Sequence, residues 1–272
     1  MALEQHTAKP IQTGRVGRGV VGSVLSGRLG WTLISFLALL ALWAIVSTVL
    51  QSRLFPGPLA VGDKFVSEAA SGELFLHVGI TLARVAVAFF LAMVLGSAIG
   101  IALGRARGGT DQFFDTWLIF FLNLPALVTI ILCYVWFGLT EVAAILAVTI
   151  NKIPNVAITV REGARSLSRD LDEMAQIYRF GTWKKLRHVV VPQLAPFFAA
   201  AARGGLALVW KIVLVVELLG RSDGVGHQLH IAFQLFDVSM ILAYAIAFIL
   251  VVQIIEIALL QPFEKRVNRW RR

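Results

Sequence analysis

Long apolar stretches alternate with short polar segments along most of this chain. The first, residues 29–50, contains no charged side chain. As a helix it would be about 33 Å long at about 1.5 Å per residue, enough to cross a hydrocarbon core of about 30 Å. Five more apolar stretches follow, at residues 77–103, 113–137, 142–160, 195–219 and 240–262. The pattern predicts an all-α, polytopic membrane protein with six transmembrane helices.

Two of the six stretches contain residues that disturb a helix. Pro125 predicts a kink in the third stretch. The fourth is interrupted by several polar or helix-breaking residues and predicts a kinked helix end or a re-entrant segment; they are Asn151, Lys152, Pro154 and Asn155. Residues 29–50 are too long for the core of a signal peptide, and no small-residue cleavage site follows, so we expect a retained helix.

Basic residues mark every second polar segment. The segments before the first stretch, after the second, after the fourth and after the sixth are rich in Lys and Arg, and the others are not. Since basic loops stay in the cytoplasm, both termini are predicted to be cytoplasmic. We divide the chain into an N-terminal arm (1–28), a transmembrane domain (29–262) with a cytoplasmic loop at about 161–192, and a basic tail (263–272).

Composition narrows the class of protein. Hydrophobic residues make up 58% of the chain and charged residues 15%, values that fit a membrane protein rather than a soluble domain. The topology accounts for most of the net charge of +9, so no nucleic-acid partner is expected. The single cysteine excludes an internal disulfide. Because the chain has no phosphate-binding loop sequence and no catalytic constellation, we expect no enzyme activity, metal or cofactor on it.

The longest polar segment contains a helix-patterned element. The spacing of Asp170 and Glu173 is typical of a capping box, and an apolar pattern at helical spacing follows at Leu171, Met174, Ala175 and Tyr178. Gly181 is expected to end this helix in a left-handed conformation. Thr182 is expected to cap a second helix, with Trp183, Leu186 and Val190 on its apolar face, and Pro192 to stop it. Pattern alone leaves two alternatives, a loop lying on anionic lipid and a docking element for a partner.

The stretch from Glu173 to Pro192 resembles the EAA loop of inner-membrane permease subunits of ABC importers. In that family a Glu-Ala-Ala start lies nineteen residues before a proline, and here Glu173, Met174 and Ala175 fill the start. The usual glycine, six residues after the glutamate, is Arg179, so the turn is expected to move to Gly181. A bulky residue at the glycine position is most similar to the nitrate, sulfonate, taurine and bicarbonate branch.

The resemblance covers residues 77–262. It includes Thr81 and Arg84, Leu124-Pro125-Ala126, Trp136-Phe137-Gly138, Glu217-Leu218-Leu219-Gly220 and Gly224-Val225-Gly226. It implies a type I ABC importer permease fold in a bacterial inner membrane. A small anion would be delivered by an external solute-binding protein, and two permease copies, or one copy and a homologue, would form the pathway. ATP and Mg would bind to separate ATPase subunits.

In the family this loop supplies a coupling helix, which sits in a cleft of the ATPase. Apolar anchors at helical spacing suit a helix in a groove, so the expected contacts are Met174, Ile177 and Tyr178, with Glu173 pairing a partner arginine or capping the loop. The rival functions are a stand-alone secondary transporter or channel and a membrane-anchored scaffold. The longer repeats or filter sequences of the former are not visible here.

Polar residues inside the apolar stretches are candidate pathway or charge-pairing residues, because charges in a membrane face a cavity or a partner. Lys211 lies near mid-depth and Glu217 near the outer end of the fifth stretch. Six residues place them roughly 120° apart on a helix, a poor geometry for a direct pair. One expectation is that Lys211 forms an ion pair with another helix or extends its ammonium group to the membrane interface. The other is that it offers its positive charge to an anion in the pathway. The other two candidates are Arg84 and Asn123.

Overall fold

The computed structural model describes residues 28–106 and 109–262. Every regular element in these ranges is a helix. The predicted arm before residue 28 and the basic tail after residue 262 lie outside the described residues. The chain divides into two compact units, residues 1–58 and residues 59–272, which are considered separately.

The first unit contains one long helix, α2 (Arg28–Leu50). It corresponds to the first predicted span and is long and apolar enough to cross a membrane. The chain turns back after it, and the indole Nε1 of Trp43 donates a hydrogen bond to the carbonyl of Pro56, 3.0 Å away.

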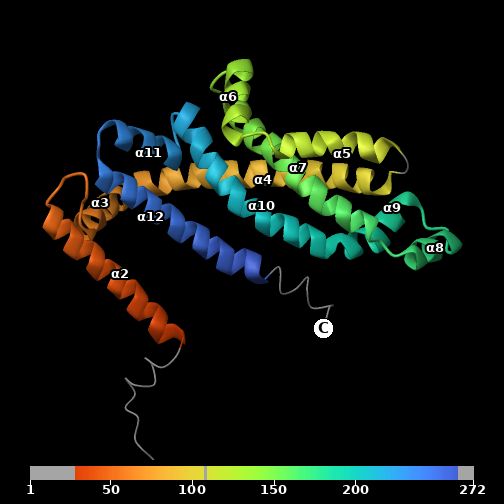
Figure 1. The fold of residues 1–272 in the computed structure, drawn as a ribbon, viewed down its shortest axis with the longest axis horizontal. Coiled ribbons are helices and arrows are strands. Elements are labelled where there is room, and N and C mark those ends of the chain that lie inside the picture. Colours follow the sequence, from red (N-terminus) through yellow and green to blue (C-terminus); the bar gives the residue numbers. More distant parts are fainter. Residues whose placement is uncertain (1–27, 107–108, 263–272) are drawn as a thin grey trace, which may run out of the picture. The chain divides into compact units, whose positions relative to one another are not determined.

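The second unit contains the remaining helices (Figure 1). They are α3 (Pro58–Ser71), α4 (Glu73–Arg105), α5 (Gly109–Leu122), α6 (Ala126–Phe137), α7 (Glu141–Arg165), α8 (Arg169–Ile177), α9 (Thr182–Lys185), the π-helix η1 (Leu186–Val190), α10 (Val191–Gly220), α11 (Val225–Gln234), α12 (Val238–Ile255) and the π-helix η2 (Glu256–Leu260). Across the described residues of both units, five helices could cross a membrane, or six with α5 and α6 counted as one bent span. This agrees with the all-α, multi-span prediction.

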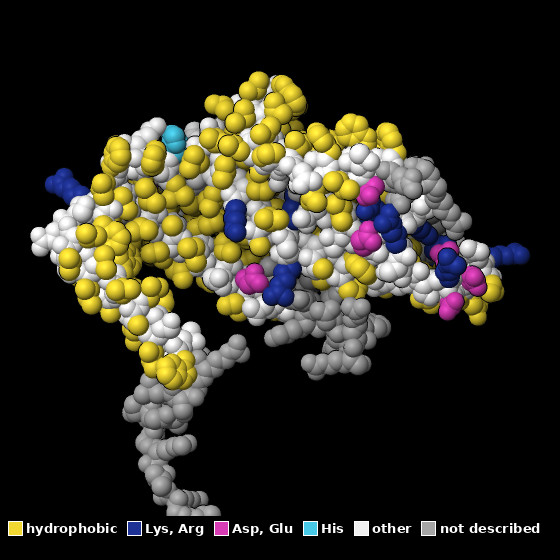
Figure 2. Space-filling view, viewed as in Figure 1, with side chains coloured by type: hydrophobic (Ala, Val, Ile, Leu, Met, Phe, Trp, Pro, Cys, Tyr) yellow, Lys and Arg dark blue, Asp and Glu magenta, His cyan; other side chains and the backbone are white. Residues whose placement is uncertain are grey.

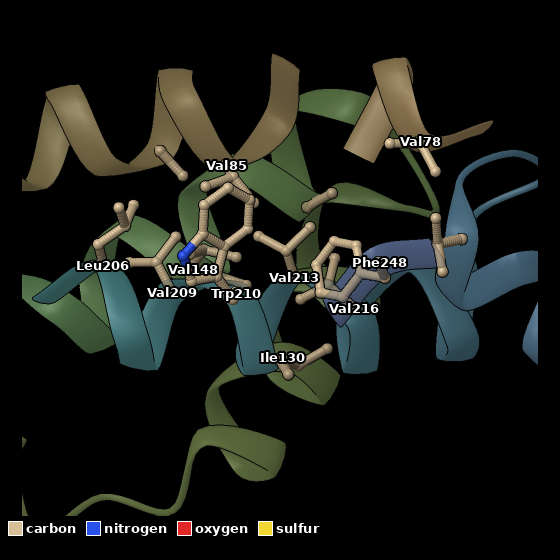
Figure 3. Packing of buried hydrophobic residues seen from close by; sticks show 14 of the residues in the cluster. Val78, Val85, Ile130, Val148, Leu206, Val209, Trp210, Val213, Val216 and Phe248 are labelled. Atoms are coloured by element: carbon tan, nitrogen blue, oxygen red, sulfur yellow. The ribbon is translucent and has the colours of Figure 1, made fainter. Parts of the chain in front are cut away.

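The main core lies where α4, α7 and α10 meet. Figure 3 shows Val209, Trp210 and Val213 of α10 close to Val85 of α4 and Val148 of α7. Since lipid is as apolar as these side chains, close packing rather than burial from water holds such helices together.

The small-residue stripe of α4 provides this packing. Ala88 and Ala92 are fully buried, and Gly96, Gly100 and Gly104 lie against α7. A Cβ at Gly100 would lie 2.6 Å from the carbonyl oxygen of Ala157. The stripe therefore serves packing within the chain at these glycines and is not free to form a dimer seam.

Gly100→Ala tests this contact. The new methyl group would overlap backbone that cannot rotate away, so we expect a loss of about 1–3 kcal/mol in the free energy of unfolding. Gly62→Ala is the matched control, because a Cβ at Gly62 meets nothing within 4 Å. Thermal unfolding of the purified protein in detergent checks both, and equal melting temperatures for the two variants would contradict the close approach.

Two proline predictions have different outcomes. Pro125 lies between α5 and α6, whose axes differ by 93°, so the expected kink is a sharp break. Pro154 lies inside α7, which is continuous from Glu141 to Arg165. The predicted interruption of the fourth span is therefore wrong. Pro154 is buried among neighbouring helices that support the helix despite the missing hydrogen bond.

Within the second unit, the short polar elements lie at opposite ends of the long helices. The short helices α8 and α9 lie at one end of α7, and α11 lies near the other end of α4 (Figure 1). Hydrophobic side chains cover most of the face shown in Figure 2, and a group of acidic and basic side chains lies toward the α8–α9 end. These two ends hold the candidate sites.

Candidate functional site

Helix α8 begins two residues earlier than the capping box predicts. Its N-cap is Ser168, whose hydroxyl oxygen accepts a hydrogen bond from the backbone N–H of Leu171 at 3.5 Å. Asp170 lies inside the first turn, where its negative charge suits the helix dipole. The Asp170–Glu173 capping box is therefore wrong, because the nearby serine provides the cap.

The turn after α8 remains at the position where the EAA family has glycine. Arg179 has φ +49°, a left-handed conformation, whereas Gly181 has φ −61°. The N–H of Phe180 donates to the carbonyl of Ala175 at 2.8 Å, and the N–H of Arg179 donates to that of Gln176 at 2.9 Å. These two bonds form a Schellman motif. The predicted displacement of the turn to Gly181 is wrong, because this motif requires the left-handed residue at position 179.

A pair of substitutions tests the turn. Arg179→Gly removes the steric cost of a side chain at positive φ, and we expect it to stabilise the protein by about 0.5–1 kcal/mol. Gly181→Ala is compatible with φ −61° and open space, so it should also stabilise, by about 0.4–1 kcal/mol. Thermal unfolding measures both changes. If Gly181→Ala destabilises the protein, Gly181 rather than Arg179 would be the residue in the left-handed conformation.

The second helix of the element continues directly into a transmembrane helix. Gly181, not Thr182, is the N-cap residue of α9, and it makes no side-chain cap bond. From Thr182 the chain stays helical through η1 and α10 to Gly220. Pro192 falls in the first turn of α10, so its prediction as a helix stop is wrong. A displacement of α9 can therefore pass into α10 without an intervening loop.

Polar contacts hold α8 against the continuous helix and against α4. Asp172 accepts from Lys185 of α9 at 2.7 Å and lies 3.7 Å from Arg105 at the end of α4. The hydrogen bond from Lys185 lowers the pKa of Asp172 below its ordinary value. The side chain of Gln193 accepts from the N–H of Ser168 at 3.0 Å. We call residues 168–190 the α8–α9 hairpin.

The α8–α9 hairpin buries one set of apolar residues and displays another. Ala175 is 1% exposed, whereas Ile177 is 78% exposed and Tyr178 is 70% exposed. Trp183 is 73% exposed, so it does not pack on the face predicted for it. Met174 is half-buried, and Glu173 and Arg179 are exposed. A held element with large exposed apolar side chains can serve as a docking surface.

At the opposite end of the second unit, five charged residues form one network, which we call the Arg84 cluster: Arg84, Glu141, Glu217, Arg221 and Asp223. Arg84 is 4% exposed and contacts three carboxylates. Its Nε and Nη2 donate to Glu141 at 2.7 and 2.8 Å, and its Nη1 donates to Glu217 at 2.8 Å. Its Nη2 also donates to Asp223.

Backbone glycines complete the environment of Glu217, which is fully buried. Its Oε2 accepts from Thr81 and from the N–H of Gly226, both at 2.9 Å. Gly224 has φ +97°, and a Cβ there would lie 2.4 Å from the carboxylate carbon of Glu217. The two glycines thus leave room for this carboxylate, and the motifs carrying Thr81, Glu217 and Gly224 meet at one place.

The other predicted membrane residues are not brought together with this cluster. Lys211 is exposed on α10 and forms no ion pair with Glu217. Asn123 is exposed at the α5–α6 break, and its side chain donates to the carbonyl of Ile119 at 2.8 Å. In the described part of the chain, no group of three or more His, Cys, Asp or Glu residues could hold a metal ion.

One buried cation was not identified from the sequence as a candidate site residue. Lys152, which was predicted to be among the residues that interrupt the fourth apolar stretch, lies in the middle of α7 and is 1% exposed. Its location inside the fourth apolar stretch could have identified it as a membrane residue. Because that stretch was expected to be interrupted there, this signal was not used.

Comparison with known families decides the class. The family described as "Binding-protein-dependent transport system inner membrane component" matches residues 96–268. The chain belongs to this family. It is the multi-pass, inner-membrane permease component of an ABC importer, it is not catalytic itself, and the permease component carries no cofactor.

Relatives and a solved structure agree with this membership. A Bacillus subtilis permease named for aliphatic sulfonates, SsuC, is 29% identical over 90% of this chain and 89% of its own length. The bicarbonate permease CmpB of Synechococcus elongatus is 27% identical over 88% and 87%. The inward-facing MetNI methionine ABC transporter superposes with a TM-score of 0.58 at 19% identity, over 70% of this chain and 92% of that one, and shows the shared fold.

Proposed function

We propose that this permease forms, with a second copy of itself, a translocation pathway for a small anion of the sulfonate, nitrate, bicarbonate or organic carboxylate type. The permease SsuC is named for aliphatic sulfonates and CmpB for bicarbonate, so their named substrates are small anions of different shape. The observation that carries the proposal is Lys211, a cation exposed on a helix of the membrane domain.

The exposed face of α10 supports this role for Lys211. Around and along this helix, Gly204, Ala207 and Lys211 recur at spacings of three and four residues and are exposed. A lysine at this depth would be costly against lipid, and small neighbours leave room beside it. This face of α10 is therefore our candidate wall of the pathway, completed by the second copy.

We further propose that the α8–α9 hairpin docks on a cytoplasmic ATPase subunit and that the Arg84 cluster faces the external binding protein. The basic-loop pattern supports this orientation. The exposed Ile177 and Tyr178 would enter a groove of the ATPase beside Met174, with Glu173 available to a basic partner. The continuous helix from Thr182 to Gly220 would carry the resulting movement into the pathway.

Reconstitution tests the function. The permease is incorporated into liposomes with its ATPase, and its binding protein is added outside with radiolabelled ethanesulfonate or bicarbonate. Uptake that requires ATP, the ATPase and the binding protein supports the proposal. Gradient-driven uptake by the permease alone would support a secondary transporter. Transport restricted to uncharged solutes would contradict the proposal that the solute is an anion.

Lys211→Gln tests the charge on the pathway wall. Removing a cation that attracts an anion should raise the KM for anion uptake by roughly tenfold, which corresponds to about 1.4 kcal/mol. Since Lys211 is exposed, the amount of protein in the membrane should stay unchanged. Uptake assays over a range of substrate concentrations measure the effect, and an unaltered KM would remove Lys211 from the pathway.

A further inference from the structure

Lys152 differs from the other buried cations in its surroundings. Arg84 and Arg161, at 4% and 6% exposure, each contact carboxylates. Among the described side chains of residues 30–106, 113–258 and 261–262, Lys152, at 1% exposure, lies within ion-pair distance of no carboxylate, and its Nζ donates only to the side-chain oxygen of Asn155, at 3.1 Å. A buried charge without a counter-charge is costly, and in a membrane segment it marks a functional position.

The location of Lys152 along its helix prevents its ammonium group from avoiding this cost by reaching water. It lies eleven residues after Glu141 and thirteen before Arg165, the two ends of α7. At about 1.5 Å per residue, each end is roughly 16–20 Å away, too far for the side chain to bring its ammonium group to an interface. Lys152 therefore remains in the middle of the membrane domain.

The side chain of Lys152 lies across a glycine of α10. A Cβ at Gly205 would be 2.8 Å from its Cε and 3.4 Å from its Nζ, and the edge of Phe89 lies beside the same position. The preceding residue, Gly204, is exposed, and a Cβ there would meet nothing within 4 Å. A side chain at position 205 would therefore collide with Lys152, and the surface of α10 beside it carries no side chain at position 204.

We propose that Lys152 is an anion-binding residue of the translocation pathway, reached through the side-chain-free stretch Gly204–Gly205 of α10. The ligand is the anionic head group of the transported solute, a sulfonate or carboxylate, which supplies the counter-charge that no described carboxylate provides. This inference rests on the proposed function. Lys211, seven residues after Gly204 on the exposed side of α10, would attract the same anion farther along the pathway.

A charge-selective cysteine reaction tests the proposal without knowledge of the natural solute. The only native cysteine, Cys133, is replaced by Ala, and Gly204→Cys is introduced as a reporter in the full transporter in membrane vesicles. Modification rates are compared for an anionic reagent, 2-sulfonatoethyl methanethiosulfonate, and a cationic one, 2-(trimethylammonio)ethyl methanethiosulfonate. The anionic reagent carries an ethanesulfonate group.

The measured quantity is the ratio of the anionic to the cationic rate. Coulomb attraction of one reagent and repulsion of the other by Lys152 should make this ratio on the order of fivefold higher than in the Lys152→Gln variant. An unchanged ratio, or no modification of the reporter by either reagent, would overturn the proposal. Absence of ATP-dependent uptake by the reconstituted wild-type transporter would instead reject the proposed function. The ratio of modification rates does not depend on that uptake, so the two failures can be distinguished.

Lys152→Met provides a second measurement. If the lysine serves ligand binding rather than stability, replacing an uncompensated buried charge by an apolar side chain of similar length should maintain or raise the melting temperature, as for other buried charges. Uptake of ethanesulfonate by the same variant should fall at least tenfold. A lowered melting temperature with unaltered uptake kinetics would assign Lys152 to the fold and overturn its role in binding.

Discussion

Replacing Arg84 by Met should destabilise the permease by about 3–5 kcal/mol, because it leaves the fully buried Glu217 without its positive partner. Glu141 and Asp223 lose the same partner, so α4 loses its ion pairs with α7 and with the chain after α10, while Arg221 still contacts Glu141. Thermal unfolding in detergent and the amount of protein in the membrane both measure this effect. Arg53→Met, at an exposed site in the first unit, is the control and should change stability by no more than about 0.5 kcal/mol.

A double variant separates the lost charge from the lost packing. In Arg84→Met with Glu217→Gln, the neutral amide oxygen still accepts from Thr81 and Gly226, but no unpaired buried charge remains. We therefore expect the double variant to be more stable than Arg84→Met alone, which is a favourable coupling between neighbouring sites. Additive losses would show that the ion pair is not the source of the effect.

Ile177→Glu should abolish ATP-dependent uptake while the permease stays folded in the membrane. Ile177 is 78% exposed, so the substitution removes nothing from the core, but it places a charge at the centre of the proposed docking surface. Loss of a central anchor typically costs 2 kcal/mol or more, which is about thirtyfold in ATPase affinity. Copurification of the ATPase and uptake in reconstituted liposomes provide the measurements.

Conservative and charge-changing variants complete this test. Ile177→Leu keeps an apolar side chain and should retain the ATPase. Glu173→Ala and Arg179→Glu should also abolish uptake, and Arg179→Glu leaves a side chain at the same left-handed position, so it changes charge without relieving the backbone. Normal ATPase binding and uptake in Ile177→Glu, Glu173→Ala and Arg179→Glu would contradict docking through the α8–α9 hairpin.

Local patterns predicted most of the helices but not their caps. The apolar stretches are long enough that length and composition alone indicate membrane helices, and all six have counterparts in the structure. At Gly181 the prediction failed because it assigned the left-handed residue by side-chain type. Whether Arg179 or Gly181 adopts positive φ depends on where α8 begins and which carbonyls remain unpaired at its end.

The candidate sites divide in the same way. Motif spacing identified the α8–α9 hairpin as a candidate, because its proposed docking residues lie close together in sequence. The Arg84 cluster joins residues more than fifty positions apart, and the sequence could name Arg84 and Glu217 as costly charges but could not pair them. Lys152 was counted among the residues that interrupt the fourth apolar stretch, because a proline two residues later predicted a break that neighbouring helices prevent.

The sequence by itself determined that this is a multi-span membrane protein, where its apolar stretches lie and the basic-loop pattern that predicts its orientation. A bilayer imposes a fixed length and a charge asymmetry that any spanning segment must show. Only the tertiary structure decided which charges are paired, which glycine contacts are tight and which buried lysine lies beside no described carboxylate. Those properties depend on distances between helices, and two residues on different helices carry no local signal of their separation.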